Sequence, residues 1–322
     1  MVGGCVRDML LGKEPKDWDI CTSAKPEEMQ QVFADVHVVD TGLQHGTLTV
    51  VLHHTPYEVT TFRIDGEYTD HRHPDAVAFV QDVREDLARR DFTVTAMAYH
   101  PQEGLVDAFS GQQDLERAVI RCVGEPAKRF EEDALRILRA MRFAATYAFA
   151  VEEKTAEAIH AMYPTLKKVA GERVREELTK LLCGKDVRRI LMDYADVISF
   201  VLPEMKAGIG FDQKTPYHKY TVYEHCVRAT ELVRPDPVLR WTMLLHDAGK
   251  PAVFFVEPNG RGHSYGHQKK SAELAAGIMQ RLHFDNVGRD KILQYIEHHD
   301  IENSTERKIL LRRIHTFGAD GL

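Results

Sequence analysis

The sequence lacks long hydrophobic runs, paired cysteines and an excess of basic residues. No apolar run reaches the roughly 18 residues that a membrane helix requires, and no charged-then-apolar secretory leader precedes Gly3. The 5 cysteines are widely spaced and form no C-x-x-C pair, which is typical of reduced thiols in the cytoplasm. The net charge of −7 argues against a surface coated with basic side chains, so nucleic acid would have to contact local patches. We therefore expect a cytoplasmic protein without membrane segments.

The N-terminal stretch combines a glycine pair with a carboxylate pair. Gly3 and Gly4 let the backbone approach a ligand, and the helix expected over residues 6–11 offers free N–H groups to an anion. Asp17 and Asp19 are separated by one residue, so in a strand both carboxylates lie on one face. Two adjacent carboxylates repel unless a cation lies between them, and Mg²⁺ prefers carboxylate and phosphate oxygens. The stretch therefore predicts a phosphate site beside a magnesium site, although each half alone is more often a simple turn or a solvated strand end.

The pairing of these two features resembles the head of polymerase-beta-type nucleotidyltransferases. The amino-acid sequence of residues 3–20 is similar to the signature of the tRNA nucleotidyltransferase and poly(A) polymerase family, class II or bacterial type. The resemblance implies that Asp17 and Asp19 are catalytic and bind Mg²⁺, and that Gly4 and Arg7 bind the nucleotide. Only two residues precede the glycine pair, so we expect a head that lacks its first strand.

Two further segments of the head resemble motifs of this family. Residues 86–98 match the motif in which an arginine precedes an aspartate, which gives Arg90 a triphosphate or sugar role. Thr95 stands where the family usually has Asn, and a hydroxyl cannot offer the two donors of an amide. Residues 65–68 resemble the flexible loop used when the pocket switches from adding C to adding A. In the strand expected over residues 57–62, Glu58 is a further candidate carboxylate, although an exposed strand residue is the commoner meaning.

Four residues spaced three apart predict the site that selects the base. Asp133, Arg136, Arg139 and Arg142 would form a slowly winding stripe on one helix. Asp133 can accept a hydrogen bond from the exocyclic amino group of C or A, and Arg136 can donate to ring acceptors. By resemblance these two read the base, while Arg139 and Arg142 bind phosphate or stack. The alternative is an ordinary Asp–Arg helix pair with solvated arginines.

A basic segment follows in the helical part of the chain. Residues 167–189 contain eight basic and four acidic residues, which predicts a contact with tRNA phosphates. A helix with a solvated charged face is an equally good interpretation.

The C-terminal third is rich in histidine. Imidazoles and a carboxylate from several helices form a ligand set for Mn²⁺, Fe, Ni²⁺ or Zn²⁺ rather than for Mg²⁺ alone. The segment resembles the HD phosphohydrolase domain, which implies His225, His246 and Asp247 as metal ligands. Three less certain candidates for a second metal are His267, His298 and His299. Asp300 or Asp320 would replace the family's closing aspartate. The alternative is that these helices form a scaffold for the tRNA elbow and have lost the ability to bind a metal.

The expected architecture is α+β and has three parts. A nucleotidyltransferase head with a mixed sheet covers 1–124, a helical neck and body cover 125–202, a linker covers 203–216, and a truncated helical HD domain covers 217–322. The resemblance implies an enzyme that adds CCA to the 3′ end of tRNA from CTP and ATP, with Mg²⁺ and without a nucleic-acid template. Two alternatives of the same chemistry are a poly(A) polymerase and an enzyme that adds only CC or only A. A third is a metal phosphodiesterase or phosphatase with a relic head.

Overall fold

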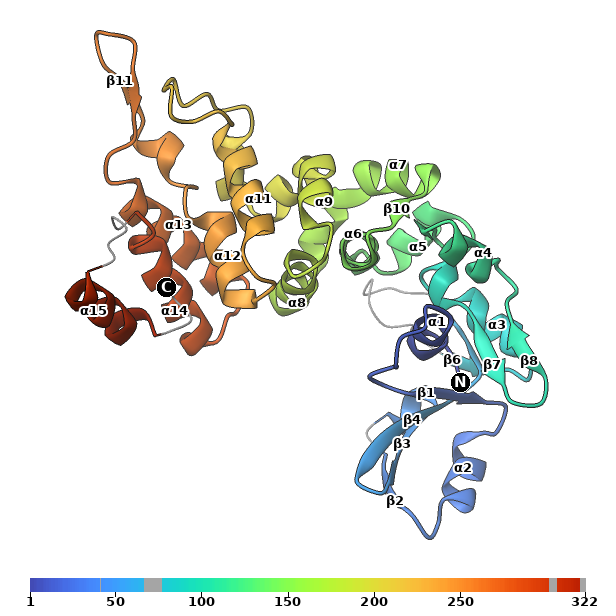
Figure 1. The fold of residues 1–322 in the computed structure, drawn as a ribbon. Helices are drawn as coiled ribbons and strands as arrows, with labels where there is room; N and C mark the ends of the chain where they lie inside the picture. The colour runs from blue at the N-terminus through green and yellow to red at the C-terminus, as the bar shows by residue number, and fades with distance from the viewer. Residues whose placement is uncertain (41, 67–76, 301–305, 319–322) are drawn as a thin grey trace. The chain divides into compact units, whose positions relative to one another are not determined.

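The computed structural model describes residues 1–40, 42–66, 77–300 and 306–318. The chain divides into two compact units, which are described separately below (Figure 1). The first unit comprises Met1–Ala140 and Phe149–Lys168, and the second comprises Met141–Ala148 and Val169–Leu322. Among the described residues, no helix combines the length and the apolar character needed to cross a bilayer.

The first unit contains a mixed four-stranded sheet in the order β1, β4, β3, β2. Its strands are β1 (Asp19–Thr22), β2 (His37–Val39), β3 (Thr47–Leu52) and β4 (Thr55–Thr61). β1 pairs with β4 in parallel, and β3 pairs with β4 and β2 in antiparallel fashion. The strands are rich in Val and Thr, whose branched side chains favour extended backbone. Helix α2 (Pro26–Val32) covers the sheet and buries Met29 against Leu48, Val50 and Val59.

A second small core holds the N-terminus in place. Val2 forms an antiparallel bridge with Ala98 and is buried with Leu87, Ala96 and Val123. The elements around this core and along the rest of the unit are α1 (Gly4–Leu10), η1 (Leu43–His45), β5 (Arg63–Asp65), β6 (Val77–Phe79), α3 (Val83–Ala88), η2 (Thr93–Thr95), β7 (Ala98–His100), β8 (Gly104–Val106), α4 (Gly111–Glu116), β9 (Val119–Ile120), α5 (Pro126–Glu132), the start of α6 (Leu135–Tyr147), β10 (Ala150–Val151), α7 (Glu153–Met162) and η3 (Tyr163–Lys168). The mixed α+β head is therefore confirmed. Within residues 65–68, which the sequence predicts as a loop, Asp65 ends strand β5, and residues 67–68 lie outside the described residues.

The second unit is almost entirely helical. Its elements are α8 (Gly171–Leu182), α9 (Val187–Asp193), α10 (Ala195–Val201), η4 (Pro203–Gly208), α11 (Val222–Leu232), α12 (Pro237–Leu245), η5 (Lys250–Val253), β11 (Phe255–Val256), β12 (Gly262–His263), α13 (His267–Arg281), α14 (Asn286–Glu297) and α15 (Arg307–Phe317). Side-chain caps fix several helix starts: Asp236 accepts from the N–H of Leu239 at 3.0 Å, and Asp285 accepts from the N–H of Gly288 at 2.8 Å. Trp241 of α12 is buried and donates from Nε1 to Oγ1 of Thr179 on α8 at 2.9 Å.

The compact units divide the chain differently from the predicted domains. The segment predicted as a linker, 203–216, lies within the second unit, and its η4 helix buries Met205 and Gly208. The neck and body predicted over 125–202 contribute to both units. Composition alone suggested a linker because the segment contains Gly, Lys and Pro, but η4 contacts α10 and α11 and Met205 is buried.

Candidate active site and candidate metal centre

In the first unit, Gly3 lies beside Asp19 and Arg90. Backbone bonds from Val2 N to Asp19 O and from Gly3 N to Met97 O, both 2.9 Å, fix the segment. Gly3 has φ of 79° and ψ of −129°, which only glycine adopts without strain. A Cβ at this position would lie 2.7 Å from Nη1 of Arg90 and 3.8 Å from Oδ2 of Asp19. The glycine therefore leaves room for the guanidinium next to the carboxylate.

The two predicted catalytic carboxylates do not share a strand. β1 begins at Asp19, and Asp17 lies exposed in the bend before it, so the predicted alternation of both residues along one strand is wrong. Their charges still interact: burial raises the pKa of Asp19, Arg90 lowers it and Asp17 raises it. The parallel register pairs Asp19 with Glu58, which places this exposed carboxylate next to Asp19 as the sequence suggested. A cation would relieve the repulsion within this group.

The predicted nucleotide-binding residues of the head lie close to the same segment. Gly4 is the first residue of α1, and its Cβ position is 3.6 Å from Nη2 of Arg7. Arg7 is buried and pairs with Oδ1 of Asp8 at 2.9 Å. Nη2 of Arg90 lies 3.4 Å from Oδ2 of the buried Asp86, while Nε of Arg90 is buried without a hydrogen-bond partner.

Asp91 organises a network that the sequence did not predict. Its Oδ2 pairs with Nη2 of Arg139 at 2.6 Å, and its Oδ1 accepts from Oγ1 of Thr95 at 2.9 Å. Burial raises the pKa of Asp91, but the guanidinium groups of Arg139 and Arg136 lower it by a larger amount. The pKa of this carboxyl group therefore lies well below its usual range. Thr95 thus has a structural partner at the position where an Asn was expected. The sequence signal for Asp91 was its place directly after Arg90.

The four predicted base-selecting residues do not lie on one helix. Asp133 has φ of −144° and ψ of 105°, ends α5 and accepts from the N–H of Leu135 at 3.0 Å, so α6 starts after it. Arg136 pairs through Nη1 with Oε2 of Glu132 at 2.6 Å. The prediction of a single stripe is wrong for Asp133, because its side chain accepts a local backbone bond that competes with helix formation.

The arginines further along α6 already have acidic partners. Arg139 binds Asp91 in the first unit, and Nε of Arg142 lies 2.7 Å from Oε2 of Glu177 within the second unit. Arg142 also lies over the ring of Phe143, with 4.1 Å from Cζ to the ring centroid. A phosphate ligand would have to share these arginines with the carboxylates.

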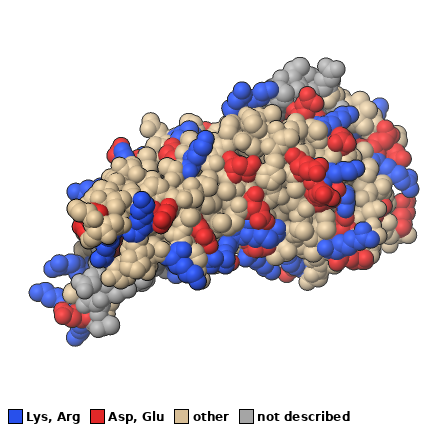
Figure 2. All heavy atoms as spheres, turned by 90° about the horizontal axis from the view of Figure 1, so that it is seen from above, with Lys and Arg blue, Asp and Glu red and all other residues tan. Residues whose placement is uncertain are grey.

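The basic segment 167–189 also divides between the units. Lys167 and Lys168 end the first unit, and the other basic residues lie on or next to α8 and α9. Arg189 pairs with Asp186 at 2.6 Å. Figure 2 shows basic and acidic side chains interspersed on the visible face rather than a continuous basic surface.

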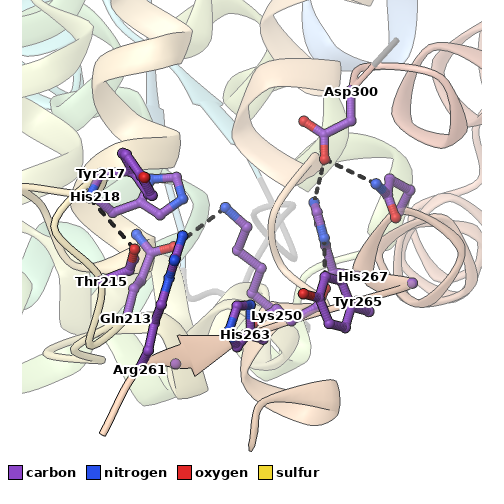
Figure 3. Close-up of a pocket in the computed structure, with 14 residues that line it drawn as sticks. Gln213, Thr215, Tyr217, His218, Lys250, Arg261, His263, Tyr265, His267 and Asp300 are labelled. Carbon is purple, nitrogen blue, oxygen red and sulfur yellow. Dashed lines mark hydrogen bonds and ion pairs between the residues drawn. The ribbon is translucent and has the colours of Figure 1, made fainter. Parts of the chain in front are cut away.

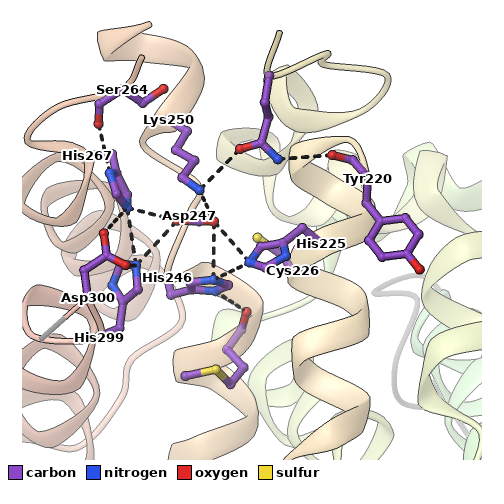
Figure 4. Close-up of polar contacts among 12 residues, drawn as sticks. Tyr220, His225, Cys226, His246, Asp247, Lys250, Ser264, His267, His299 and Asp300 are labelled. Atoms are coloured by element: carbon purple, nitrogen blue, oxygen red, sulfur yellow. Dashed lines mark hydrogen bonds and ion pairs between the residues drawn. The ribbon is translucent and has the colours of Figure 1, made fainter. Parts of the chain in front are cut away.

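In the second unit, a single carboxylate lies between two pairs of imidazoles (Figure 4). Oδ2 of Asp247 lies 3.3 Å from Nε2 of His225 and 3.4 Å from Nε2 of His246. Oδ1 lies 3.1 Å from Nε2 of His267 and 3.5 Å from Nε2 of His299. Among the described residues, these two sets are the groups of three or more side chains whose ligand atoms lie within 4.8 Å of one another. The predicted metal ligands therefore converge.

The hydrogen bonds of the imidazoles point their second nitrogen at the cluster. In His246, His267 and His299, Nδ1 lies 2.8, 2.9 and 2.7 Å from the carbonyl oxygen three residues earlier. A carbonyl only accepts, so Nδ1 carries a proton, and a neutral ring in this orientation presents its lone pair at Nε2. Nε2 of His225 faces Nε2 of His246 at 3.1 Å, an arrangement that needs a proton or a cation between the rings.

The electrostatics of the cluster also suit a cation. Burial and the neighbouring His246 lower the pKa of His225 to about 4, so its ring is neutral near pH 7. Burial raises the pKa of Asp247, but the surrounding imidazoles lower it further, which keeps the carboxylate ionised. Oδ1 of Asp247 is buried and has no well-aligned hydrogen-bond partner. A metal ion would satisfy this oxygen and the lone pairs around it.

Two close contacts assemble these ligands. A Cβ at Gly249 would lie 2.5 Å from the N of Ser271 and 2.8 Å from the carbonyl oxygen of His267, so only glycine lets the turn after Asp247 approach α13. Nζ of the buried Lys250 lies 2.7 Å from Oδ2 of Asp247. The close approach brings His267 to the carboxylate.

The remaining predicted ligands behave differently. His298 is exposed, lies next to Phe317 and belongs to neither group. Asp300 is exposed at the edge of the cluster, with Oδ2 3.5 Å from Nε2 of His267. Asp320 lies outside the described residues.

Comparison with known proteins finds matches in both compact units. Residues 1–121 match the family model of the poly A polymerase head domain, and residues 148–209 match that of the probable RNA and SrmB-binding site of polymerase A. A CCA-adding enzyme of Lactobacillus delbrueckii subsp. bulgaricus is 50% identical over 193 residues, which are 60% of this chain and 48% of the relative. The chain is thus similar to a CCA-adding enzyme over about 60% of its length. The CCA-adding enzyme of Leuconostoc mesenteroides is also 50% identical, over 59% of this chain and 47% of its own.

Solved structures of CCA-adding enzymes share the fold. The Bacillus stearothermophilus CCA-adding enzyme in complex with CTP has a TM-score of 0.69 and 32% identity, covering 93% of this chain and 65% of that one. The Thermotoga maritima CCA-adding enzyme complexed with tRNA has a TM-score of 0.59 and 22% identity, covering 98% and 68%. The chain spans about half the length of the curated CCA-adding enzymes that it matches.

Proposed function

We propose that this protein is a CCA tRNA nucleotidyltransferase that adds C, C and A to the 3′ end of tRNA from CTP and ATP. The observation that carries the proposal is the meeting of Gly3, Asp19 and Arg90 in a head that matches the poly A polymerase family. Curated relatives at 50% identity are CCA-adding enzymes, and a related structure contains CTP. A poly(A) polymerase and an enzyme adding only CC or only A remain the rivals within the same chemistry.

The predicted site residues of the head bind either the metal or the triphosphate in this proposal. Asp17 and Asp19 would hold Mg²⁺, with Glu58 beside them in the sheet register. When bound, Mg²⁺ neutralises charge on the phosphates and favours attack by the 3′-hydroxyl on the α-phosphate. Gly4, Arg7 and Arg90 would bind the triphosphate.

Base selection is assigned to the junction between α5 and α6. Asp133 would accept from the amino group of C or A, and Arg136 would donate to the ring. Their local bonds, from the N–H of Leu135 and to Glu132, would hold both side chains in fixed orientations. Arg139 and Arg142 would contribute to phosphate binding while paired with Asp91 and Glu177.

The proposed partner is tRNA, bound mainly through its phosphates and its duplex shape. Support comes from the match of residues 148–209 to a family described as a probable RNA-binding site. We place the reaction in the cytoplasm, where the five cysteines, all free in the structure, would remain reduced.

The decisive experiment uses tRNA that lacks CCA, with radiolabelled CTP and ATP. We expect products extended by C, C and A, read by length on a gel. Asp19→Asn should lower incorporation by at least about a hundred-fold, since metal-binding carboxylates act directly on the reacting phosphates. Asp35→Asn, which changes an exposed carboxylate after α2, is the matched control and should keep full activity. Incorporation of ATP but not CTP would instead identify a poly(A) polymerase.

A second function, metal-dependent phosphoester hydrolysis, is favoured by the cluster around Asp247. We propose that His225, His246 and Asp247 bind one Mn²⁺, Fe, Ni²⁺ or Zn²⁺ ion, and that Asp247, His267 and His299 bind another, as in an HD domain. Such metals act as Lewis acids and activate a bound water. The substrates would be phosphomonoesters or 2′,3′-cyclic phosphates.

Metal content tests the second function directly. The purified full chain should retain metal, measured by inductively coupled plasma mass spectrometry. His246→Ala should remove most of it, because one ligand of the first group is lost. His298→Ala, which changes an exposed imidazole outside both groups, should retain it. Equal metal content in both variants would contradict the assignment.

A further inference from the structure

A buried carboxylate in the first unit, Asp86 on α3, takes part in none of the roles proposed above. Its exposed fraction is 1%, so a bound nucleotide would not contact it. Burying an ionised carboxylate costs free energy unless the charge is paired and hydrogen-bonded. The contacts of Asp86 therefore indicate what its charge does in the head.

One oxygen of Asp86 pairs with the arginine of the proposed triphosphate site. Nη2 of Arg90 lies 3.4 Å from Oδ2 of Asp86. Among the described residues, Asp86 is the only carboxylate within ion-pair distance of Arg90. Nε of Arg90 is buried without a hydrogen-bond partner, and Nη1 lies 2.7 Å from the position that a Cβ on Gly3 would occupy. The orientation of the Arg90 guanidinium therefore depends on Asp86.

The other oxygen of Asp86 is held by a second arginine. Nη2 of Arg89 lies 2.7 Å from Oδ1 of Asp86, and Nε of Arg89 donates to the same oxygen at 3.0 Å. Because the guanidinium is planar, two of its N–H groups on one oxygen fix the direction of the contact. These bonds leave Oδ2 to face Arg90.

The backbone of β5 completes the environment of Oδ1. The N–H of Arg63, the first residue of β5, donates to Oδ1 of Asp86 at 3.2 Å. The carbonyl oxygen of Arg63 accepts from Nε of Arg89 at 3.1 Å. Both polar backbone groups of Arg63 are therefore bound by side chains from the end of α3. Asp86 is anchored through Oδ1 to the strand and to Arg89, so its position does not depend on Arg90.

The spacing along α3 brings the three charged groups together. Arg89 and Arg90 follow Asp86 by three and four residues, which places their side chains on the same helical face as the carboxylate. Arg89 has helical backbone angles, φ of −84° and ψ of −8°, so the turn continues past the last residue of the helix. The start of α3 is fixed by Asp82, whose side chain accepts from the N–H of Arg84 at 2.9 Å. A short helix that is anchored at both ends thus carries the whole group.

We propose that Asp86 is a positioning residue that holds Arg90 in the orientation needed to bind the triphosphate of CTP or ATP. The inference rests on the proposed function for the role of Arg90. A guanidinium that is paired on one edge with a buried carboxylate keeps its other N–H groups for phosphate oxygens and loses less freedom when the nucleotide binds. Asp86 thus acts on the reaction through Arg90 and not by contact with the substrate.

Steady-state kinetics of Asp86→Asn test the proposal, because this variant keeps the shape of the side chain and removes its charge. The KM for CTP on tRNA that lacks CCA should rise about ten-fold, while kcat should fall by less than about three-fold, since the triphosphate is bound both before and during the reaction. The KM for ATP on tRNA that ends in CC should rise by the same factor, because both nucleotides carry the triphosphate. Unequal rises would point to base selection and would overturn the assignment.

A double-mutant cycle assigns the effect to Arg90. In an Arg90→Ala background, Asp86→Asn should change the KM for CTP by less than about two-fold, because the group that it positions is absent. The matched control is Arg261→Ala, which removes an arginine that lines a pocket in the second unit and lies over the ring of Tyr217 (Figure 3). In that background Asp86→Asn should retain its effect of about ten-fold. Additive effects of Asp86→Asn and Arg90→Ala would overturn the proposal, since a purely structural Asp86 would act equally in both backgrounds.

Two further variants separate positioning from a loss of stability. Met29→Ala removes a side chain from the core between α2 and the sheet, and it should lower the melting temperature while changing the KM for CTP by less than about two-fold. Asp86→Glu keeps the charge but shifts it by one methylene group, so it should fold and raise the KM by a smaller factor that also disappears in the Arg90→Ala background. Equal rises in KM for Met29→Ala and Asp86→Asn would assign the effect to stability and overturn the proposal. Circular dichroism would verify that each variant is folded.

Calorimetric titration of the full chain with CTP measures affinity without turnover, and it therefore distinguishes failure of this inference from failure of the proposed function. Weaker CTP binding by Asp86→Asn, in a protein that incorporates no CTP into tRNA, would remove the proposed function and support the positioning role. Incorporation of CTP, with equal affinities for the unchanged protein and Asp86→Asn, would support the proposed function and overturn the positioning role.

Discussion

At the scale of single residues, Gly3 is the most constrained position of the head. Its backbone angles exclude other residues, and any Cβ would displace Arg90. Gly3→Ala should therefore lower nucleotide incorporation by at least about a hundred-fold and destabilise the fold by about 1 to 3 kcal/mol. Gly12→Ala is the matched control, because Gly12 has φ of 67° but open space around it. Gly12→Ala should lower the free energy of unfolding measured in urea, because its backbone is strained, but it should keep full nucleotide incorporation.

Asp91 gives the head a pH dependence whose sign follows from its ion pair. Its pKa in the folded state lies below the unfolded value of about 3.9, so the stabilisation is complete above that value and is lost as pH falls toward the folded pKa. Asp91→Asn should cost about 2 kcal/mol near pH 7, because Arg139 loses its partner while remaining partly solvated. In urea denaturation, the difference in the free energy of unfolding between the unchanged protein and Asp91→Asn should shrink below about pH 4. A difference that grows on acidification would contradict the stabilising role of the Asp91–Arg139 ion pair.

At the scale of elements, the contact between the turn at Gly249 and α13 brings together the ligands of the proposed metal centre. Gly249 has an ordinary φ of −80°, so Gly249→Ala adds no backbone strain but forces the two segments apart. We expect loss of metal and a lower melting temperature. Gly277→Ala within α13 meets open space and should stabilise the helix by up to about 1 kcal/mol while leaving metal content unchanged. Metal analysis and thermal unfolding of both variants would check this.

The sequence predicted elements best where a local pattern dominates. The alternating β-branched strands of the sheet and the convergence of His225, His246 and Asp247 follow from the sequence and from the family resemblance. Prediction from the sequence failed where a tertiary contact or a local polar contact decides where a helix begins or which residues pair. The periodicity from Asp133 to Arg142 indicates one helix, but the Asp133 side chain accepts a backbone bond and interrupts it. The partnership of Asp91 with Arg139 joins residues 48 positions apart, and no periodic signal reports such a pair.

At the scale of the whole molecule, two compact units should respond to different ligands. Ions that bind only the folded cluster stabilise the unit that contains it, by an amount that grows with ion concentration. In calorimetry, Zn²⁺ or Ni²⁺, which prefer imidazole ligands, should raise the unfolding transition of the second unit and not that of the first. The shift should vanish in His246→Ala and persist in His298→Ala. A shift of equal size in all three proteins would place the ion elsewhere.

The hydrogen bond from Trp241 to Thr179 has a consequence for how the chain can be divided. The helices of the body and those that carry the imidazoles share one interior, in which Trp241, Leu178 and Leu182 are all shielded from water. A protein ending at the predicted boundary near residue 203 would leave the indole's former neighbours facing solvent. Such a truncation would aggregate rather than yield a minimal enzyme, so a useful shortened version has to retain α12 with α8.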